Sequence, residues 1–269
     1  INKSTDNGAT WRNLTHVSQP EPISGNFVVA LGCQHAGGRD IVWGATWVAE
    51  GETEYNAVSR SLDGGLTWKS FLRDEKAHNF AFDDSVVYVA ADNGLFVSHD
   101  LGENWYLYPP MRDARDGDRV LGTEAYSAYA LEGTLWAGMA DGLARTSDNG
   151  FTWDIYRAFT PTGRGGEKRT YAYPNPFSPM RQNQIGGDGY VRFQYNTRTA
   201  ARVTVKVFDF AMERVATVID GEYRIGPSEC AEIWNGRNDY GDQVANGAYF
   251  YSIEIENDGT YWGKVLIIN

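Results

Sequence analysis

The sequence contains 269 residues, more than one average domain, and this length favours two domains. Hydrophobic residues make up 42% of it and aromatic residues 14%, with 30 glycines, a composition typical of many short strands and tight turns. The formal net charge of −11 argues against nucleic acid and anionic membranes as partners, because both attract clustered lysines and arginines. No apolar stretch approaches the roughly 18 residues of a membrane-spanning helix.

One eight-residue pattern, Ser/Thr-x-Asp-x-Gly-x-x-Trp, occurs four times in the first 160 residues. Its defining positions are Ser4, Asp6, Gly8 and Trp11; Ser61, Asp63, Gly65 and Trp68; Ser98, Asp100, Gly102 and Trp105; and Thr146, Asp148, Gly150 and Trp153. The distances between successive tryptophans bracket the roughly 40–50 residues of a four-stranded propeller blade. The first copy begins close to Ile1, which is neither an initiator methionine nor part of a signal peptide. We therefore expect the sequence to be the C-terminal part of a longer protein, or a processed product.

The pattern predicts a hairpin turn that closes in the same way each time. The aspartate can accept hydrogen bonds from backbone N–H groups of the turn, and the hydroxyl can add another side-chain-to-backbone bond. The glycine supplies a position with positive φ, and the tryptophan starts the next strand and buries a large ring. Runs such as 86–91 and 95–98, joined by Asp-Asn-Gly, read as the strands of these hairpins.

These four motifs resemble the Asp-box, or bacterial neuraminidase repeat, which sialidases, xyloglucanase-like glycoside hydrolases, sortilin-type receptors and photosystem assembly factors carry. The resemblance implies a β-propeller in which each box joins the third and fourth strands of a blade. It also implies that the box residues are structural and lie outside any catalytic site. Residues 1–160 would then hold three blades and one final strand of a longer propeller.

The second part of the chain differs in composition and strand spacing. Residues 161–171 lack an apolar period, so we expect a linker there. About seven short strands in residues 172–269 predict an immunoglobulin-like sandwich, which makes the whole chain all-β. We expect Cys33 and Cys230 to be buried free thiols, because they form neither a disulfide framework nor a metal-binding spacing.

Residues 172–269 also carry a family resemblance. The run Tyr-Pro-Asn-Pro-Phe at 173–177 and the stretch from Trp234 to Tyr251 resemble the immunoglobulin-like module of flagellar hook-cap proteins. The same module is the C-terminal sorting domain of many type IX secretion cargoes, and its terminal position here favours that role. The resemblance implies that residues 172–269 contact the secretion machinery and direct export, followed by release or surface anchoring, and hence an extracellular or outer-surface location. The sequence departs from the family at Met212, where a glycine is usual.

No set of residues selects a catalytic site. A sialidase needs an arginine cluster, and a xyloglucanase-like enzyme needs two aspartates from different blades. The available side chains are Arg39, Arg112, Arg115, Arg119 and Arg145, and Asp40, Asp113 and Asp141. No spacing distinguishes them from solvated loop residues, so we assign no catalytic residue.

Two further groups are candidates for binding. Trp47 and Tyr55 lie in the longest segment between boxes, where an aromatic loop could stack on sugar rings, whereas Trp43 is expected in the core. Asp113, Asp116 and Asp118 could offer oxygen ligands to Ca²⁺, but their alternation with arginines favours a salt-bridged loop. The four histidines lack metal-ligand spacing, and no cofactor is expected.

The sequence thus favours a secreted or cell-surface protein whose propeller binds a glycan or protein ligand without catalysis. An alternative is a sialidase- or xyloglucanase-like glycoside hydrolase whose catalytic blades lie upstream. A second alternative is a structural subunit of an extracellular assembly, with sheet edges covered by another chain.

Overall fold

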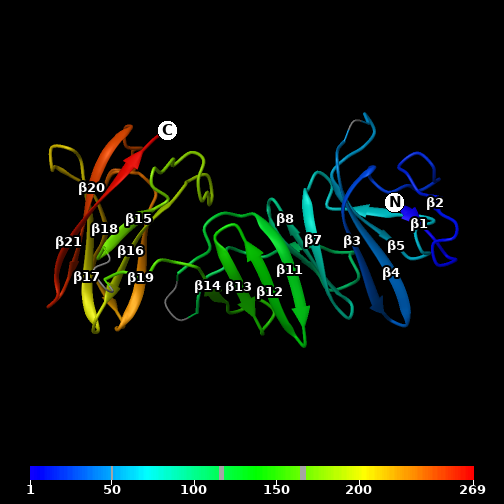
Figure 1. Ribbon diagram of the computed structural model, residues 1–269, viewed down its shortest axis with the longest axis horizontal. Coiled ribbons are helices and arrows are strands. Elements are labelled where there is room, and N and C mark those ends of the chain that lie inside the picture. Colours follow the sequence, from blue (N-terminus) through cyan, green and yellow to red (C-terminus); the bar gives the residue numbers. More distant parts are fainter. Residues whose placement is uncertain (50, 115–117, 164–167) are drawn as a thin grey trace. The chain divides into compact units, whose positions relative to one another are not determined.

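The computed structural model describes residues 1–49, 51–114, 118–163 and 168–269, and it divides into two compact units, Ile1–Arg157 and Ala158–Asn269. Within these residues every regular element is a strand, so the chain is all-β (Figure 1). No helix long and apolar enough to cross a membrane occurs in the described part of the chain.

The first unit contains three four-stranded antiparallel sheets, each with its strands in chain order (Figure 1). They are built from β3 (Phe27–Ala36), β4 (Arg39–Trp47), β5 (Ala57–Ser61) and β6 (Lys69–Phe71); β7 (Ala77–Asp83), β8 (Val86–Ala91), β9 (Gly94–Ser98) and β10 (Tyr106–Leu107); and β11 (Ala125–Leu131), β12 (Thr134–Met139), β13 (Gly142–Thr146) and β14 (Asp154–Tyr156). A two-stranded sheet of β1 (Asn2–Lys3) and β2 (Arg12–Asn13) precedes them. Repeated four-stranded meanders of this kind are consistent with propeller blades.

Apolar residues between the sheets hold the first unit together. Ile41 and Trp43 on β4 pack into one core with Phe80 and Val89 of the next sheet. A second core joins the sheet of β7–β10 to that of β11–β14, and the first strands of neighbouring sheets, β3, β7 and β11, contact one another. Trp43 is fully buried, as the sequence predicts.

The second unit consists of two antiparallel sheets that share one core. One sheet contains β15 (Thr170–Tyr173), β16 (Val191–Thr197) and β19 (Ser228–Trp234); the other contains β18 (Arg214–Arg224), β17 (Ala201–Phe208), β20 (Gly247–Ile255) and β21 (Gly259–Ile267). Alternate residues of β16, β17 and β20 point into the core, where Phe193 of β16 stacks on Tyr251 of β20 at a ring distance of 4.2 Å. Gly263 faces this ring, and a Cβ there would overlap Tyr251.

The structure differs from two expectations. The predicted linker 161–171 is partly integrated into the second unit, because Thr162 is buried and donates its N–H and hydroxyl to Glu229 (2.9 Å each), while β15 begins at Thr170. The expectation of two buried thiols is wrong for Cys33, which is exposed on the same face of β3 as Leu31 and His35. Cys230 is half-buried, and this burial raises the pKa of its thiol.

Candidate functional site

The four motif turns share one hydrogen-bond pattern. In the second copy, Ser61 Oγ donates to Asp63 Oδ1 (2.8 Å) and accepts from the Gly65 N–H (2.7 Å). Asp63 accepts from both the N–H and the hydroxyl of Thr67, at 3.0 and 2.6 Å. The other copies repeat these bonds, with Asn104 replacing the threonine in the third. Each motif glycine has a φ between 86° and 90°.

These bonds lower the pKa of the motif carboxyls. In Asp6 and Asp148 the hydrogen bond from the threonine hydroxyl is the largest cause, and it lowers the pKa to about 2. In Asp100 the largest cause is the hydrogen bond from the backbone N–H of Asn104, and the pKa is again about 2. At Asp63 partial burial opposes the shift, but the bonds from Thr67 and Ser61 outweigh it and hold the pKa far below its usual range. The motif carboxylates are therefore ionised and engaged inside their own turns at neutral pH.

The turns join the third and fourth strands of each four-stranded sheet, and the first copy joins β1 to β2. Trp68 and Trp153 are buried, and Trp105 packs edge-on against Trp43 with ring centroids 6.1 Å apart. Trp11 differs, because 64% of its side chain is exposed. Burial of the motif tryptophan therefore holds where a neighbouring sheet packs against it, and not in the first copy.

A row of rings lies at the opposite ends of the strands. Phe27 begins β3, Trp47 ends β4, His78 lies at the start of β7, and Tyr126 at the start of β11. Successive ring centroids are 6.0, 5.3 and 5.4 Å apart, each pair in an edge-on arrangement. We call Phe27, Trp47, His78 and Tyr126 the ring row; it crosses all three four-stranded sheets of the first unit.

Local strand irregularities place two of these rings. The pairing of β7 with β8 shifts between Ala77 and Asn79, and the pairing of β11 with β12 shifts between Ala125 and Ser127. His78 and Tyr126 are therefore the extra residues of equivalent β-bulges, which redirect a side chain out of the regular alternation. Bulges are common beside functional sites for this reason.

Polar contacts hold the ring row in place. The Trp47 indole donates to the Ala77 carbonyl (2.9 Å), and His78 Nε2 lies 2.7 Å from Asp92 Oδ1. The Lys76 ammonium lies 5.8 Å from the centre of the Trp47 ring, within the range of a cation–π contact. Phe27 and Tyr126 are about half exposed. The row therefore offers two half-exposed rings, Phe27 and Tyr126, and two partly buried rings held in place, beside a cation and a carboxylate.

The two residues predicted to bind a ligand have different surroundings. Trp47 belongs to the ring row, whereas Tyr55 packs against the Arg73 guanidinium at 3.9 Å and donates its N–H to the Ser24 carbonyl. Sequence reasoning missed His78 and Tyr126. Both follow an alanine at the start of the first strand of a repeat unit, and aligning the units on their boxes could have found them.

The candidate catalytic arginines and aspartates are engaged separately. Arg145 pairs with Asp154 at 2.6 Å and lies over Trp136, while Asp40 contacts His35 at the turn after β3. Asp113 is buried and accepts from the Ile155 N–H at 2.8 Å. Arg39 is exposed at the start of β4. The backbones of Arg112 and Arg119 form an isolated antiparallel β-bridge.

The acidic segment after β10 forms ion pairs. Arg157 binds both Asp118 and Asp141. Arg115 and Asp116 lie outside the described residues. Among the residues that the structure places, no group of three or more His, Cys, Asp or Glu side chains could hold a metal ion.

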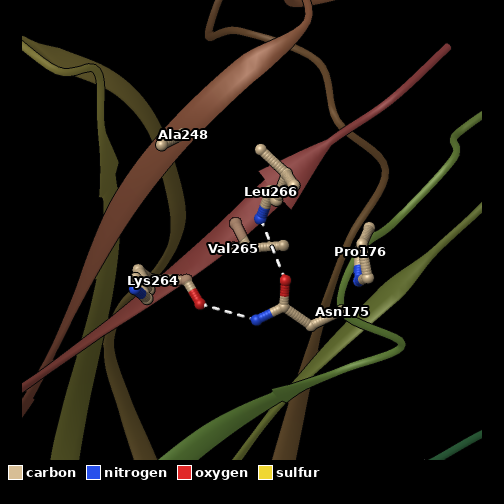
Figure 2. A pocket seen from close by; sticks show the side chains of 6 residues that line it. All are labelled: Asn175, Pro176, Ala248, Lys264, Val265 and Leu266. Atoms are coloured by element: carbon tan, nitrogen blue, oxygen red, sulfur yellow. Dashed lines mark hydrogen bonds between the residues drawn. The ribbon is translucent and has the colours of Figure 1, made fainter.

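The second unit carries a shallow pocket of about 340 Å³ beside its last strand (Figure 2). Asn175 lies along the edge of β21, where its amide nitrogen donates to the Lys264 carbonyl and its oxygen accepts from the Leu266 N–H, both at 3.0 Å. The neighbouring Phe177 continues this pairing with Leu266 and Ile268. The Tyr-Pro-Asn-Pro-Phe run thus satisfies backbone groups of a sheet edge that would otherwise be open.

Comparisons with known proteins give only distant structural similarity. No protein-family model and no curated protein matches the sequence. The solved structures similar to it include PorZ, a bacterial surface component of the type IX secretion system of Porphyromonas gingivalis, at 16% identity and a TM-score of 0.32, covering 90% of this chain and 30% of that one. An ancestral GH74 enzyme matches at 12% identity and a TM-score of 0.43, covering 97% and 35%.

Latent PorU from the same bacterium matches at 11% identity and a TM-score of 0.28, covering 90% of this chain and 34% of that one. The chain therefore spans about a third of the length of each of these three structures. All three TM-scores are below 0.5, so we base the function on the residues of this chain.

Proposed function

We propose that this chain is a secreted or surface-displayed binding protein without catalytic activity. Its first unit would consist of Asp-box propeller blades that present the ring row to a carbohydrate ligand. Its second unit would be an immunoglobulin-like sorting domain that the type IX machinery recognises and that anchors or releases the protein outside the cell.

The ring row is the observation that carries the binding proposal. Aromatic faces stack on the apolar faces of sugar rings, and rings fixed by packing lose little entropy on binding. Trp47 and His78 are held by Ala77 and Asp92, so their positions are set before a ligand arrives. The motif carboxylates, in contrast, are engaged inside their turns, which supports a structural role for all four boxes.

A binding titration tests this proposal. The full chain is titrated calorimetrically with xyloglucan oligosaccharides, mixed-linkage β-glucan oligosaccharides and sialyllactose. We expect binding of at least one of these probes, weakened about tenfold or more by Trp47→Ala and by Tyr126→Ala. Tyr129→Ala is the matched control, because Tyr129 is an exposed tyrosine of the same strand outside the ring row.

Equal binding by all four proteins would contradict the site, and absence of binding to every probe would contradict the ligand class. Hydrolysis of a probe would contradict the non-catalytic assignment. Export is tested separately by expressing the chain in a bacterium with and without a functional type IX system. We expect surface or medium localisation only in the former.

A further inference from the structure

The outward face of the larger sheet in the second unit carries a group of aromatic side chains. Phe208 on β17, Phe250 on β20 and Trp262 on β21 point away from the core that Val207, Tyr251 and Val265 fill from the other side. Phe210 lies in the turn after β17 and is 80% exposed. We call Phe208, Phe210, Phe250 and Trp262 the outer aromatic face.

Two ring contacts and one cross-strand pair, Phe208 with Phe250, connect the residues of this face. Phe208 and Trp262 have centroids 5.3 Å apart, although β20 separates their strands, and Phe210 lies 6.3 Å from Phe250. Trp262 and Met212 are about half exposed. Folding leaves these large apolar groups in contact with water, and contiguous patches of this kind mark interaction sites.

Two lysines lie within the face, and Glu254 lies further along β20 on the same side. Lys264 is the cross-strand neighbour of Phe250, and Lys206 lies in the row of Ser252 and Trp262. No ion pair of either lysine occurs among the described residues, whereas Arg214 at the edge pairs with Asp239 at 3.5 Å. The pocket of Figure 2, lined by Lys264 and Leu266, continues the face along β21.

We propose that the outer aromatic face is a docking site for another protein, whose contacting surface has an apolar centre bordered by carboxylates. Phenylalanine, tryptophan and methionine are enriched at the centres of protein interfaces, and unpaired lysines at the rim select an acidic partner. The proposal concerns the second unit and does not depend on a ligand for the ring row.

The other occupants fit the face less well. A second copy docked about a two-fold axis would bring the lysines of both copies onto one interface, where like charges repel. An anionic membrane would place negative charge opposite Asp209 and Glu213, in the turn of Phe210, as well as opposite the lysines, whereas a protein can place its carboxylates opposite Lys206 and Lys264 alone.

Site-specific photocrosslinking tests the proposal with the full chain. Benzoylphenylalanine replaces Phe210 in one variant and Tyr240 in a control, because Tyr240 is a 91% exposed aromatic residue in a loop of the same unit. After irradiation of the producing cells, we expect a protein adduct at position 210 and none at 240. The captured protein is identified, purified and titrated with the chain.

In that titration we expect Trp262→Ala to weaken binding about tenfold or more, and Tyr240→Ala to leave it unchanged. The double change Lys206→Gln with Lys264→Gln should slow association and reduce its dependence on salt. No adduct at position 210, an adduct with a second copy, a lipid or a glycan, or equal binding by all variants would overturn the proposal. Circular dichroism of each variant confirms that it is folded.

Discussion

Trp47 and His78 come from neighbouring four-stranded sheets, and their ring centroids lie 5.3 Å apart in an edge-to-face arrangement. The indole is fixed by the Ala77 carbonyl and the imidazole by Asp92, so one contact ties the end of β4 to the start of β7. We expect Asp92→Asn to reduce the affinity for a ligand of the ring row by less than Trp47→Ala does, because Asp92→Asn changes the orientation of a ring without removing one. Calorimetry with the same glycan probe compares the two variants, and a larger loss for Asp92→Asn would contradict this order.

The close approach of Gly263 to Tyr251 predicts a large loss of stability. A methyl group at position 263 would overlap the Tyr251 ring in the middle of the second core, and overpacking typically costs about 1–3 kcal/mol. We expect Gly263→Ala to lower the free energy of unfolding of the second unit by about 3 kcal/mol in urea titrations. Thr260→Ala, on the exposed face of the same strand, should change it by less than about 0.5 kcal/mol. Similar values for both variants would show that the packing is looser than described.

The turn after β17 predicts a stabilising substitution. Met212 has a φ of 64°, a conformation that costs a side-chain-bearing residue energy and that glycine adopts freely. We expect Met212→Gly to raise the free energy of unfolding by about 0.5–1 kcal/mol, whereas Ala211→Gly next to it should lower it. Thermal denaturation measures both, and a lower melting temperature for Met212→Gly would argue against this turn geometry.

The stability of the second unit depends on the carboxylate of Glu232, which is buried and pairs with the partly exposed Arg224. Glu232 accepts from the Tyr195 hydroxyl (2.7 Å) and from Arg224 (2.9 and 3.0 Å). Removal of the carboxylate would leave both donors without this partner, which costs about 3 kcal/mol or more. We therefore expect Glu232→Ala to be far less stable than Asp239→Ala, which removes an exposed acceptor of Arg214 and of the Thr217 N–H. Equal effects in chemical denaturation would contradict the network.

The low pKa values of the motif aspartates predict that acid lowers the free energy of unfolding of the first unit. Their folded pKa of about 2 in Asp6, Asp100 and Asp148 lies below the usual value of 3.8, so their contribution is present above about pH 4 and is lost as the pH falls towards 2. Asp148→Asn should flatten the decline in stability between pH 5 and about 2. Asp40→Asn, an exposed aspartate outside the boxes, serves as the control. Urea titrations at each pH give the slopes, and an unchanged slope for Asp148→Asn would refute the assignment.

Local signals in the sequence predicted the strands and the motif turns, because each depends on residues within one hairpin. The alternation of Val203, Val205 and Val207, for example, coincides with the buried face of β17. The ring row could not be predicted from local signals, because β-bulges place His78 and Tyr126 and both rings contact rings of other sheets. Trp47 was predicted as a candidate because it lies in the longest segment between boxes.

The burial of a residue could not be predicted from the sequence where it depends on a partner far away in the chain. Cys33 is apolar enough for a core, but it lies on a face of β3 that stays exposed. The residues next to Thr162 in the sequence are typical of a linker, yet Glu229 of β19 accepts hydrogen bonds from both the N–H and the hydroxyl of Thr162.

The most direct test of the central claim is ¹⁹F NMR of the full chain labelled with 5-fluorotryptophan and titrated with a bound glycan probe. The Trp47 resonance, assigned with Trp47→Phe, should shift or broaden as the ligand covers the ring row. The signals of Trp11 in the first motif turn and Trp136 on β12 should stay in place. A shift confined to Trp136 or Trp11, or no shift at saturation, would contradict the proposal that this propeller-like unit binds its ligand through the ring row.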